Sequence, residues 1–462
     1  MKPKIGLLPL YLKLYDDAMP DIRAGFAEML DGLTARLTEK GLEIVRADVC
    51  RVRNEFAAAI TRFESEDIDL LVSVHLAYSP SLESAEVLAQ SNLPLLMLDT
   101  TVDARFTQNT DPMRLMFNHG IHGVQDLASV LRRMGKRYEI IAGHCEDKRV
   151  FDQVAQHARG AKIARELRST KAVRIGETFE GMGDFAVADS VLANNLGITV
   201  QQVDVSPVAL HAANISEQEV LEECKEDHSR YEVTASDDVH RRSARAGLAL
   251  RNFLDANAYT AFSMNFLAFN QPSGPLDTVP FLEASNAMAR GIGYAGEGDV
   301  LTASLVGALQ RGLGDTTFTE IFCPDWKSQT LFISHMGEVN PLIAAGKPRL
   351  CEKEFPWTPA QNPAILACAP KPGPGVLVNI APGPNNSFSL IFAEMKIQRE
   401  LKTTRFRDWV RGWISPAIDI GEFLEQYSRA GGTHHCALVI GSKLPELRAF
   451  AAYAALEHTV IG

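Results

Sequence analysis

The sequence lacks the features that mark secreted and membrane proteins. Its seven cysteines are odd in number, widely scattered and without a C-x-x-C pair, which argues against both a disulfide framework and a thiolate zinc site. No apolar stretch approaches the roughly 18 residues that a membrane span requires. The N-terminal segment MKPKIGLLPLYLKLYDD resembles a short secretory signal, but Lys13 interrupts its apolar run and no small-residue cleavage site follows. We therefore expect a cytoplasmic protein without membrane contact.

The chain also lacks net positive charge. It carries 46 basic and 57 acidic residues, a formal net charge of −11, so its overall field repels nucleic acid unless one face is locally basic. One stretch around Trp409 and Trp413 is basic, with Lys396, Arg399, Lys402, Arg405, Arg407 and Arg411. Alternating charge of this kind is typical of a solvated or subunit-facing barrel surface. We therefore expect neutral molecules or cations as partners, and no nucleic acid.

The length and composition indicate several packed domains. At roughly 150 residues per domain, 462 residues suggest about three domains. A hydrophobic content of 46% is ample for buried cores. No internal repeat and no long disordered linker is present. Changes of pattern along the chain place the predicted domains at 1–165, 166–318 and 319–462.

The first two regions alternate short apolar runs with amphipathic segments. The runs predicted as buried strands are KIGLLPL, GLEIVRADV, DLLVSVH, LPLLMLDT and YEIIAGH, followed later by AVRIGE and ITVQQVDV. Repeated βα units of this kind predict doubly wound parallel sheets. Because ligands bind such sheets near the C-terminal strand ends, four side chains there are candidates for binding: His75, Tyr78, His119 and His122.

The pattern changes after about residue 318. Short runs such as TLFISHM, AILACA, GVLVNIA and FSLIFAEM are separated by proline and glycine clusters, which is typical of an antiparallel sheet or barrel. A final helix is predicted over PELRAFAAYAALEH, 445–458. The predicted fold is therefore α/β, with two doubly wound parallel-sheet domains followed by a β-rich, barrel-like C-terminal domain.

A glycine-rich stretch in the central region, GIGYAGEGDVLTASL, contains the spacing G-x-G-x-x-G. That spacing binds dinucleotides when a strand precedes it and an acid follows about 20 residues later. Here a predicted helix, PFLEASNAMAR, precedes Gly291 and the acid is missing, so we expect no nucleotide cofactor. We expect instead that the glycines form a turn that presents Glu297, and that Asp299 caps the following helix.

Two strand candidates place polar side chains among apolar ones. Alternation in TTFTEIF puts Glu320 between Phe318 and Phe322 on one face. A carboxylate in that position lies either at an edge, or buried with a partner or a metal ion. Alternation in TLFISHM puts His335 on an apolar face, where a histidine is most often a hydrogen-bonded core residue.

Adjacent histidines precede another apolar strand in GGTHHCALVI. In a strand His434 and His435 point to opposite faces, so at most one faces a given site directly. Glu297 by itself can equally be a solvated loop acid. Together, two carboxylates and one or two histidines form a hard ligand set that suits Mn²⁺, Mg²⁺ or Zn²⁺. The spacings of 23, 15 and 100 residues match no local metal motif, so the residues alone suggest a metal cluster without establishing it.

The order of these motifs resembles that of bacterial L-arabinose isomerases, within the wider L-arabinose/L-fucose isomerase group. The segments GYAGEGDVLTASLVGAL, GDTTFTEIF, ISHMGEVNP and AGGTHH follow the family order, and FNHGIHG and IIAGHCEDK are also similar, so the resemblance spans nearly the whole chain. It implies that Glu297, Glu320, His335 and His435 bind one divalent metal ion, usually Mn²⁺, with Mg²⁺, Co²⁺ or Zn²⁺ as alternatives. The two glutamates are also the implied catalytic acid and base.

The resemblance implies an aldose–ketose isomerase. Such an enzyme moves a proton between C1 and C2 of a free sugar through an enediol, which requires a base, an acid and stabilisation of charge on the sugar oxygens. His122 matches a family histidine that reaches the active site of a neighbouring subunit. A homo-oligomer, trimer or hexamer, with active sites between subunits is therefore implied. Tyr78 and His434 complete the expected substrate contacts.

Three segments depart from the family pattern. Gly6-Leu7-Leu8-Pro9 replaces a more polar turn, Gly123-Val124-Gln125-Asp126 lacks the family arginine, and NFLAF, expected as a strand over 265–269, replaces a more polar segment. These losses fit a sugar of different length, stereochemistry or oxidation state. Two alternatives stay open: a homologue that binds carbohydrate without turnover, and a metal-assisted hydrolase or lyase acting on a sugar derivative.

Overall fold

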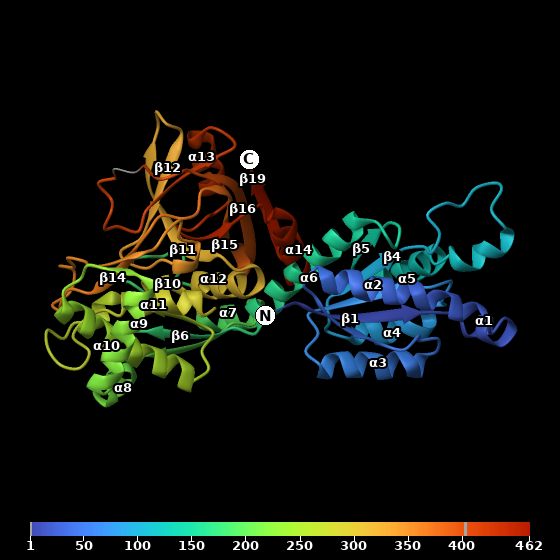
Figure 1. Ribbon diagram of the computed structural model, residues 1–462, viewed down its shortest axis with the longest axis horizontal. Helices are drawn as coiled ribbons and strands as arrows, with labels where there is room; N and C mark the ends of the chain where they lie inside the picture. Colours follow the sequence, from blue (N-terminus) through green and yellow to red (C-terminus); the bar gives the residue numbers. More distant parts are fainter. Residues whose placement is uncertain (1, 402–403) are drawn as a thin grey trace. The chain divides into compact units, whose positions relative to one another are not determined.

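The computed structural model describes residues 2–401 and 404–462, which form two compact units (Figure 1). The first unit comprises residues 1–165 with Arg448–Ala454, and the second comprises residues 166–447 with Ala455–Gly462. Lys402 of the basic stretch lies outside the described residues. The predicted boundaries between three domains stay a prediction.

The first unit is a doubly wound parallel sheet. Its strands are β1 (Lys4–Leu10), β2 (Glu43–Arg46), β3 (Leu70–His75), β4 (Leu95–Asp99) and β5 (Glu139–Ala142), in the order β2-β1-β3-β4-β5. Its helices are α1 (Lys13–Ala18), η1 (Ile22–Phe26), α2 (Ala27–Glu39), α3 (Arg53–Ser65), α4 (Ser81–Gln90), η2 (Pro112–Phe117), α5 (Ile121–Arg133) and most of α6 (Lys148–Arg168). Apolar side chains of α2 and α6 cover one face of the sheet, and those of α3, α4 and α5 cover the other. All five predicted strands are confirmed.

The second unit begins with a four-stranded parallel sheet. Its strands are β6 (Lys171–Ile175), β7 (Thr199–Val203), β9 (Ala261–Met264) and β10 (Gly293–Gly296), in the order β10-β9-β6-β7. Its helices are α7 (Asp189–Leu196), α8 (Ser206–Asn214), α9 (Glu217–Arg230), α10 (Asp237–Ala256), α11 (Phe281–Ala289) and α12 (Val300–Leu313). The helix predicted before the glycine-rich stretch is confirmed as α11.

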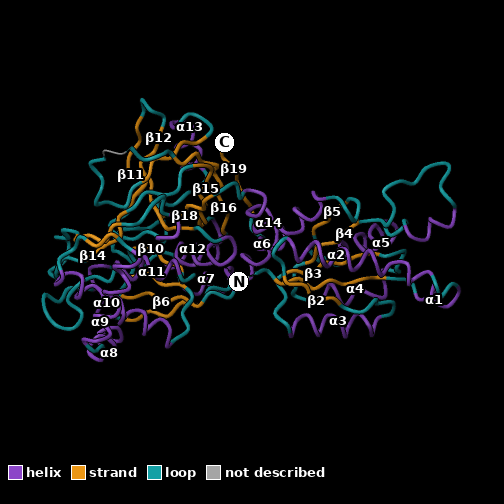
Figure 2. Tube along the Cα trace, viewed as in Figure 1, coloured by secondary structure: helices purple, strands orange, loops and turns teal. Residues whose placement is uncertain are grey.

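A closed antiparallel barrel of six strands follows. Its strands are β11 (Thr316–Asp325), β12 (Thr330–Ser334), β15 (Gly373–Pro382), β16 (Phe388–Ile397), β17 (Gly412–Pro416) and β18 (His435–Ile440), and pairing of β15 with β16 closes the ring. In Figure 2 the labelled strands of this barrel gather above α12. Apolar residues of these strands share one core with α13 (Ile420–Arg429). Two short helices, η4 (Pro341–Ile343) and η5 (Pro384–Asn386), lie in the connections. The predicted fold class is confirmed.

In the C-terminal region one predicted strand is confirmed but lies outside the barrel, and the predicted final helix is wrong at its C-terminal end. The run AILACA forms β14 (Ala364–Ala367), but this strand lies outside the barrel, in a small sheet with β13 (Arg349–Glu352) and β8 (Glu232–Val233). The predicted final helix stops early: α14 (Leu444–Ala454) ends before Ala455, whose φ of 62° is left-handed. Residues 457–461 instead form β19, parallel to β16. Backbone pairing with the barrel edge overrides the helical periodicity there.

The segment NFLAF is also not a strand. Pairing of β9 ends at Met264, and the side chain of Asn265 accepts a hydrogen bond from the Leu267 backbone N–H at 3.0 Å. This local bond starts a short 3₁₀ helix, η3 (Phe266–Ala268). An asparagine that satisfies the backbone locally competes with continuation of the sheet.

All seven cysteines are free thiols, as their scattered positions indicate. Among the residues that the structure describes, no helix has both the length and the apolar character needed to cross a membrane. Within the basic stretch, Arg407 lies 2.9 Å from Glu232 and Arg411 pairs with Glu400. These arginines therefore face acidic partners of their own chain.

Gly293 allows β10 to approach α12 more closely than any other residue would permit. A Cβ at this position would lie 1.9 Å from the Ala303 carbonyl oxygen and 2.6 Å from the Gly307 nitrogen. Because both contacts are with backbone, Gly293→Ala is expected to lower the free energy of unfolding by about 3 kcal/mol in urea titrations. Gly346→Ala is the matched control, since no atom lies within 4 Å of its added Cβ. Equal stability of the two variants would contradict this packing argument.

Candidate metal centre

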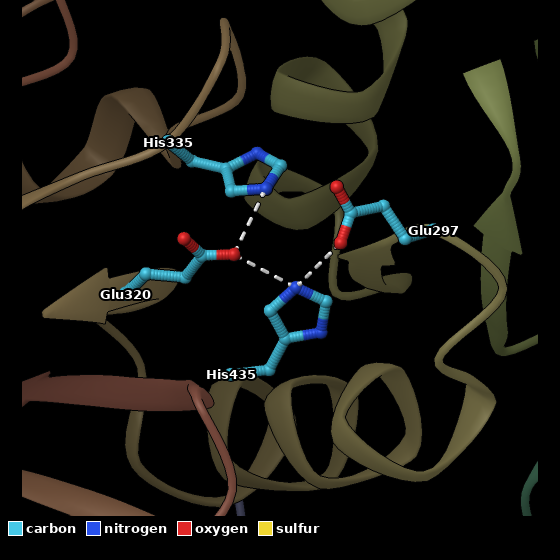
Figure 3. Close-up of side chains that lie close together, drawn as sticks. All are labelled: Glu297, Glu320, His335 and His435. Carbon is cyan, nitrogen blue, oxygen red and sulfur yellow. Dashed lines mark ion pairs between the residues drawn. The ribbon is translucent and has the colours of Figure 1, made fainter. Parts of the chain in front are cut away.

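Four side chains of the second unit converge on one point (Figure 3). Glu297 follows β10, Glu320 lies within β11, His335 follows β12 and His435 begins β18. Each offers one ligand atom, and these atoms all lie within 4.8 Å of one another. The four residues are those that the motif order implied. Their arrangement is that of a group able to hold a metal ion.

Glu320 is central to this cluster. Its Oε1 lies 2.9 Å from His435 Nε2 and 3.4 Å from His335 Nε2, and Glu297 Oε2 lies 3.4 Å from the same His435 nitrogen. Although buried, Glu297 Oε2 and His435 Nε2 have no hydrogen bond of acceptable geometry. Unsatisfied buried polar atoms are costly unless a ligand or ion completes them. Two carboxylate oxygens and two imidazole nitrogens suit a hard or borderline divalent cation.

Backbone geometry, rather than a long glycine turn, presents Glu297. The stretch Gly293–Gly296 is a buried strand, so the expected glycine turn is confined to the residues that follow it. Glu297 itself has a φ of 64°, a left-handed conformation that is uncommon outside glycine and is concentrated at functional sites. Its N–H donates to the Met264 carbonyl at 3.0 Å, and its carbonyl accepts from Phe179 N–H at 2.9 Å. Neighbouring backbone therefore holds this conformation in place.

Another glycine makes room for a histidine ring. A Cβ on Gly296 would lie 2.9 Å from His335 Cε1. Gly291 has a φ of 89° just after α11 ends. The three glycines of the G-x-G-x-x-G spacing are thus explained without a nucleotide. Gly293 and Gly296 are needed for close packing, and Gly291 for its left-handed backbone.

The alternation predicted for β11 is observed as far as Glu320. Phe318 is fully buried and its ring packs on the rings of His335 and His435, with centroids 4.6 and 4.8 Å away. The Glu320 side chain is 16% exposed and lies among imidazoles, so of the two alternatives it is the paired carboxylate. The register of β11 shifts after Ile321, and Phe322 is exposed.

His335 has a carboxylate partner that the sequence analysis missed. Its Nδ1 lies 2.7 Å from Glu338 Oε2, which also accepts from the Gly337 N–H at 2.8 Å. The other oxygen of Glu338 accepts a hydrogen bond from the Tyr294 hydroxyl at 2.6 Å. Glu338 is almost completely buried. The spacing H-x-x-E in the motif SHMGE is the signal that could have identified it.

His435 has an equivalent partner in Asp299. The side chain of Asp299 caps α12 as predicted, because its Oδ1 accepts from the Thr302 N–H at 2.8 Å. Its second oxygen lies 2.9 Å from His435 Nδ1. Both side chains are fully buried. The capping role was readable from the sequence, whereas the contact with His435 spans 136 positions and was not.

Both histidines of the adjacent pair reach the cluster, which corrects the expectation that only one would. His434 precedes β18, so strand alternation does not govern it. Its Nε2 lies 3.9 Å from a carboxylate oxygen of Glu297 and 3.9 Å from one of Glu320. Its Nδ1 lies 2.7 Å from Asp184 Oδ2, a partner that the sequence analysis did not find. His434 is 40% exposed, unlike the two buried histidines.

The cluster is electrostatically polarised. Burial acts to raise the pKa of Glu297, but the neighbouring imidazoles outweigh it and hold the pKa at about 2. The same balance holds the pKa of Glu320 far below its usual range. Burial acts to lower the pKa of His335, yet Glu338 and Glu320 raise it to about 10, and surrounding carboxylates raise the pKa of His435 well above 6.5. Without a cation, two carboxylates face two imidazolium rings.

The remaining candidates belong to the first unit. Tyr78 donates a hydrogen bond to Asp126 Oδ2 at 3.2 Å, and His122 lies near the start of α5 beside His119. His75 ends β3, where it is buried with neither ring nitrogen hydrogen-bonded. Burial lowers its pKa to about 4, so it is neutral at pH 7. The predicted substrate contacts of Tyr78 and His122 stay predictions.

Comparisons with known proteins place the chain in a family. Models of the N-terminal, central and C-terminal domains of L-arabinose isomerase match residues 13–169, 171–312 and 315–457. The L-arabinose isomerase of Acidothermus cellulolyticus is 28% identical over 450 residues, 93% of this chain and 86% of its own length. That of Nocardioides sp. is 29% identical over 360 residues, 75% of this chain and 70% of its own.

A third relative, the L-arabinose isomerase of Escherichia coli strain K12, is 27% identical over 410 residues, 85% of this chain and 80% of its own. Among solved structures, the periplasmic arabinose-binding protein of Shewanella sp. ANA-3 aligns with 67% of this chain and 84% of its own, at 12% identity and a TM-score of 0.17. A score this low carries no inference. The domain matches span nearly the whole chain in the expected order, which confirms the resemblance read from the motifs. The chain belongs to the L-arabinose isomerase family of sugar isomerases, as a divergent member.

Proposed function

We propose that this protein is a metal-dependent aldose–ketose isomerase that acts on a free sugar through an enediol. The observation that carries the proposal is the convergence of four ligand atoms within 4.8 Å, two of them buried without a hydrogen bond. Membership in a family of sugar isomerases supports the same reaction class. The chemistry of the donor set supports Mn²⁺, with Mg²⁺, Co²⁺ or Zn²⁺ as alternatives.

In this proposal Glu297, Glu320, His335 and His435 hold the metal ion. When bound, the ion supplies positive charge that stabilises negative charge developing on the sugar oxygens. The protein's own part begins with the two carboxylates. Their low pKa values keep both ionised near neutral pH, so both are able to accept protons.

The isomerisation moves two protons. A base takes the proton from C2 of the aldose while the C1 oxygen gains a proton, which gives the enediol. The same base then returns its proton to C1 while the C2 hydroxyl loses one, which gives the ketose. We assign these transfers to Glu297 and Glu320, because they are the carboxylates of the cluster and their oxygens face a common point. His434, half-exposed beside both, is assigned a contact with the sugar hydroxyls.

The proposal also covers the class of sugar, the assembly and the location of the protein. The apolar replacements near the N-terminus and at Phe266–Ala268 favour a sugar that differs from L-arabinose in length, stereochemistry or oxidation state. A homo-oligomer, trimer or hexamer, in which His122 contacts the sugar of a neighbouring subunit, follows from the family resemblance. Tyr78 is proposed as a further contact with the sugar. A cytoplasmic location is part of the same proposal.

The test is proton exchange and ketose formation across a panel of pentoses, hexoses and 6-deoxyhexoses in D₂O, followed by NMR with Mn²⁺ and then with EDTA. We expect one sugar class to give deuterium at C2 and ketose signals only when Mn²⁺ is present. Binding without exchange, from folded and Mn²⁺-loaded protein, would favour the non-catalytic alternative. Cleaved products from the sugar or its derivatives would favour the hydrolase or lyase alternative.

A further inference from the structure

We propose that three carboxylates, Asp184, Asp299 and Glu338, are positioning residues that orient the three histidines of the centre. Each one contacts the Nδ1 atom of a histidine whose Nε2 faces Glu297 or Glu320. None of the three contacts the point where the four ligand atoms converge. The inference rests on the proposed function, because it concerns how that site is kept ready for a metal ion and a sugar.

All three pairs have the same geometry, with a carboxylate oxygen at hydrogen-bond distance from Nδ1. The distance from carboxylate oxygen to Nδ1 is 2.9 Å for His435, 2.7 Å for His335 and 2.7 Å for His434. A carboxylate accepts a hydrogen bond, so it fixes the proton of each ring on Nδ1. The lone pair of a neutral ring is then on Nε2, the atom directed at the cluster. This arrangement sets both the tautomer and the rotation of each ring.

The three pairs divide by exposure. Asp299 with His435 is fully buried, and Glu338 with His335 is nearly so. The side chains of Asp184 and His434 are 37% and 40% exposed. A buried pair can serve only the interior of the cluster, whereas the exposed pair faces solvent, from which a substrate arrives. We therefore assign Asp299 and Glu338 to positioning the two metal-binding histidines, and Asp184 to positioning His434 for contact with the sugar.

One short segment connects the buried pairs to the glycine-rich stretch. Tyr294 in β10 donates its hydroxyl to Glu338, and Asp299 contacts His435 directly. Glu297 lies between them in the sequence. Residues 294–299 therefore supply the ligand Glu297 and orient two further ligands, His335 through Glu338 and His435 through Asp299. These roles account for the carboxylates of this stretch and for its close packing.

A purely structural role is the rival explanation, because any buried imidazole needs a partner. The chain contains a matched control for it. Asp227 is fully buried and its Oδ2 lies 3.0 Å from Nε2 of the buried His240, in a pair formed by α9 and α10 away from the four ligand residues. Asp227→Asn removes a buried carboxylate charge beside a histidine, together with the ion pair of Asp227 to Arg230 at 2.9 Å, without touching the cluster.

The experiment compares wild type with Asp299→Asn, Glu338→Gln, Asp184→Asn and Asp227→Asn. Mn²⁺ affinity is measured by calorimetry, the ligand environment by visible absorption of the Co²⁺-loaded protein, and folding by urea titration. We expect Asp299→Asn and Glu338→Gln to lower Mn²⁺ affinity about 10- to 100-fold and to alter the Co²⁺ spectrum. Asp184→Asn is expected to keep wild-type Mn²⁺ affinity and to raise KM for the sugar. Asp227→Asn is expected to change neither the Mn²⁺ affinity nor the KM for the sugar.

Unchanged Mn²⁺ affinity and Co²⁺ spectrum in both buried variants would overturn the inference while leaving the proposed function intact. An equal loss in Asp227→Asn would show that general destabilisation, not positioning, explains the result. Absence of Mn²⁺ binding by folded wild type would instead overturn the metal-dependent function and the inference with it. If Glu338→Gln does not fold, Tyr294→Phe tests the same connection, since it removes only the outer partner of Glu338. A smaller fall in affinity supports the inference, and no fall overturns it.

Discussion

Replacing Glu320 by glutamine is expected to lower sugar isomerisation by about 10³-fold, within the range that a positioned acid or base contributes. The physical reason is that Glu320 Oε1 lies within 3.4 Å of two buried imidazole nitrogens, those of His435 and His335. Glu297 lies that close to only one, that of His435. Glutamine keeps the size and one acceptor oxygen but can neither take a proton nor add negative charge. The loss therefore affects proton transfer and metal binding together.

Turnover of Glu320→Gln is measured with the sugar that wild type isomerises, at saturating Mn²⁺, and folding is checked by urea titration. Glu394→Gln serves as the control, because Glu394 is an exposed acid on β16 outside the cluster. We expect the control to retain wild-type turnover. Turnover of Glu320→Gln within threefold of wild type would exclude Glu320 as a catalytic acid or base.

Mn²⁺ affinity is expected to rise steeply with pH. In the metal-free protein burial acts to lower the pKa of His335, but nearby carboxylates raise it to about 10, and they raise the pKa of His435 well above 6.5. At pH 7 both rings therefore carry a proton that a metal ion must displace. Each displaced proton makes apparent affinity rise about tenfold per pH unit, so the two together give up to about 100-fold per unit.

The sign of the effect on stability is opposite. A raised histidine pKa stabilises the metal-free fold fully below about pH 6.5, and this contribution is lost as pH rises toward the folded-state value of about 10. Mn²⁺ should therefore stabilise the protein more at pH 8 than at pH 6. Calorimetry between pH 6 and 8, in two buffers of different ionisation enthalpy, counts the protons released. An affinity independent of pH with no proton release would refute the charged-histidine description.

Local sequence patterns predicted the structure correctly where residues close together in the sequence determine it. Alternating apolar runs predicted the parallel strands, and Asp299 was correctly predicted to cap α12 because a cap involves residues three positions apart. The same signals failed at NFLAF and at the C-terminus, where a side-chain hydrogen bond and a distant strand edge decide the backbone. Alternation also failed for His434, because the strand begins one residue later.

The sequence by itself determined the fold class and the family, because hydrophobic pattern and motif order can be read along the chain. The family resemblance in turn implied the four residues that the structure brings together. Only the tertiary structure decided how those residues are held. The contacts of Asp184 with His434 and of Asp299 with His435 join positions 250 and 136 residues apart. No periodicity extends over such separations, because these partners meet only when the parallel sheet and the barrel of the second unit pack together. The side chains that orient the candidate ligands are therefore a product of packing.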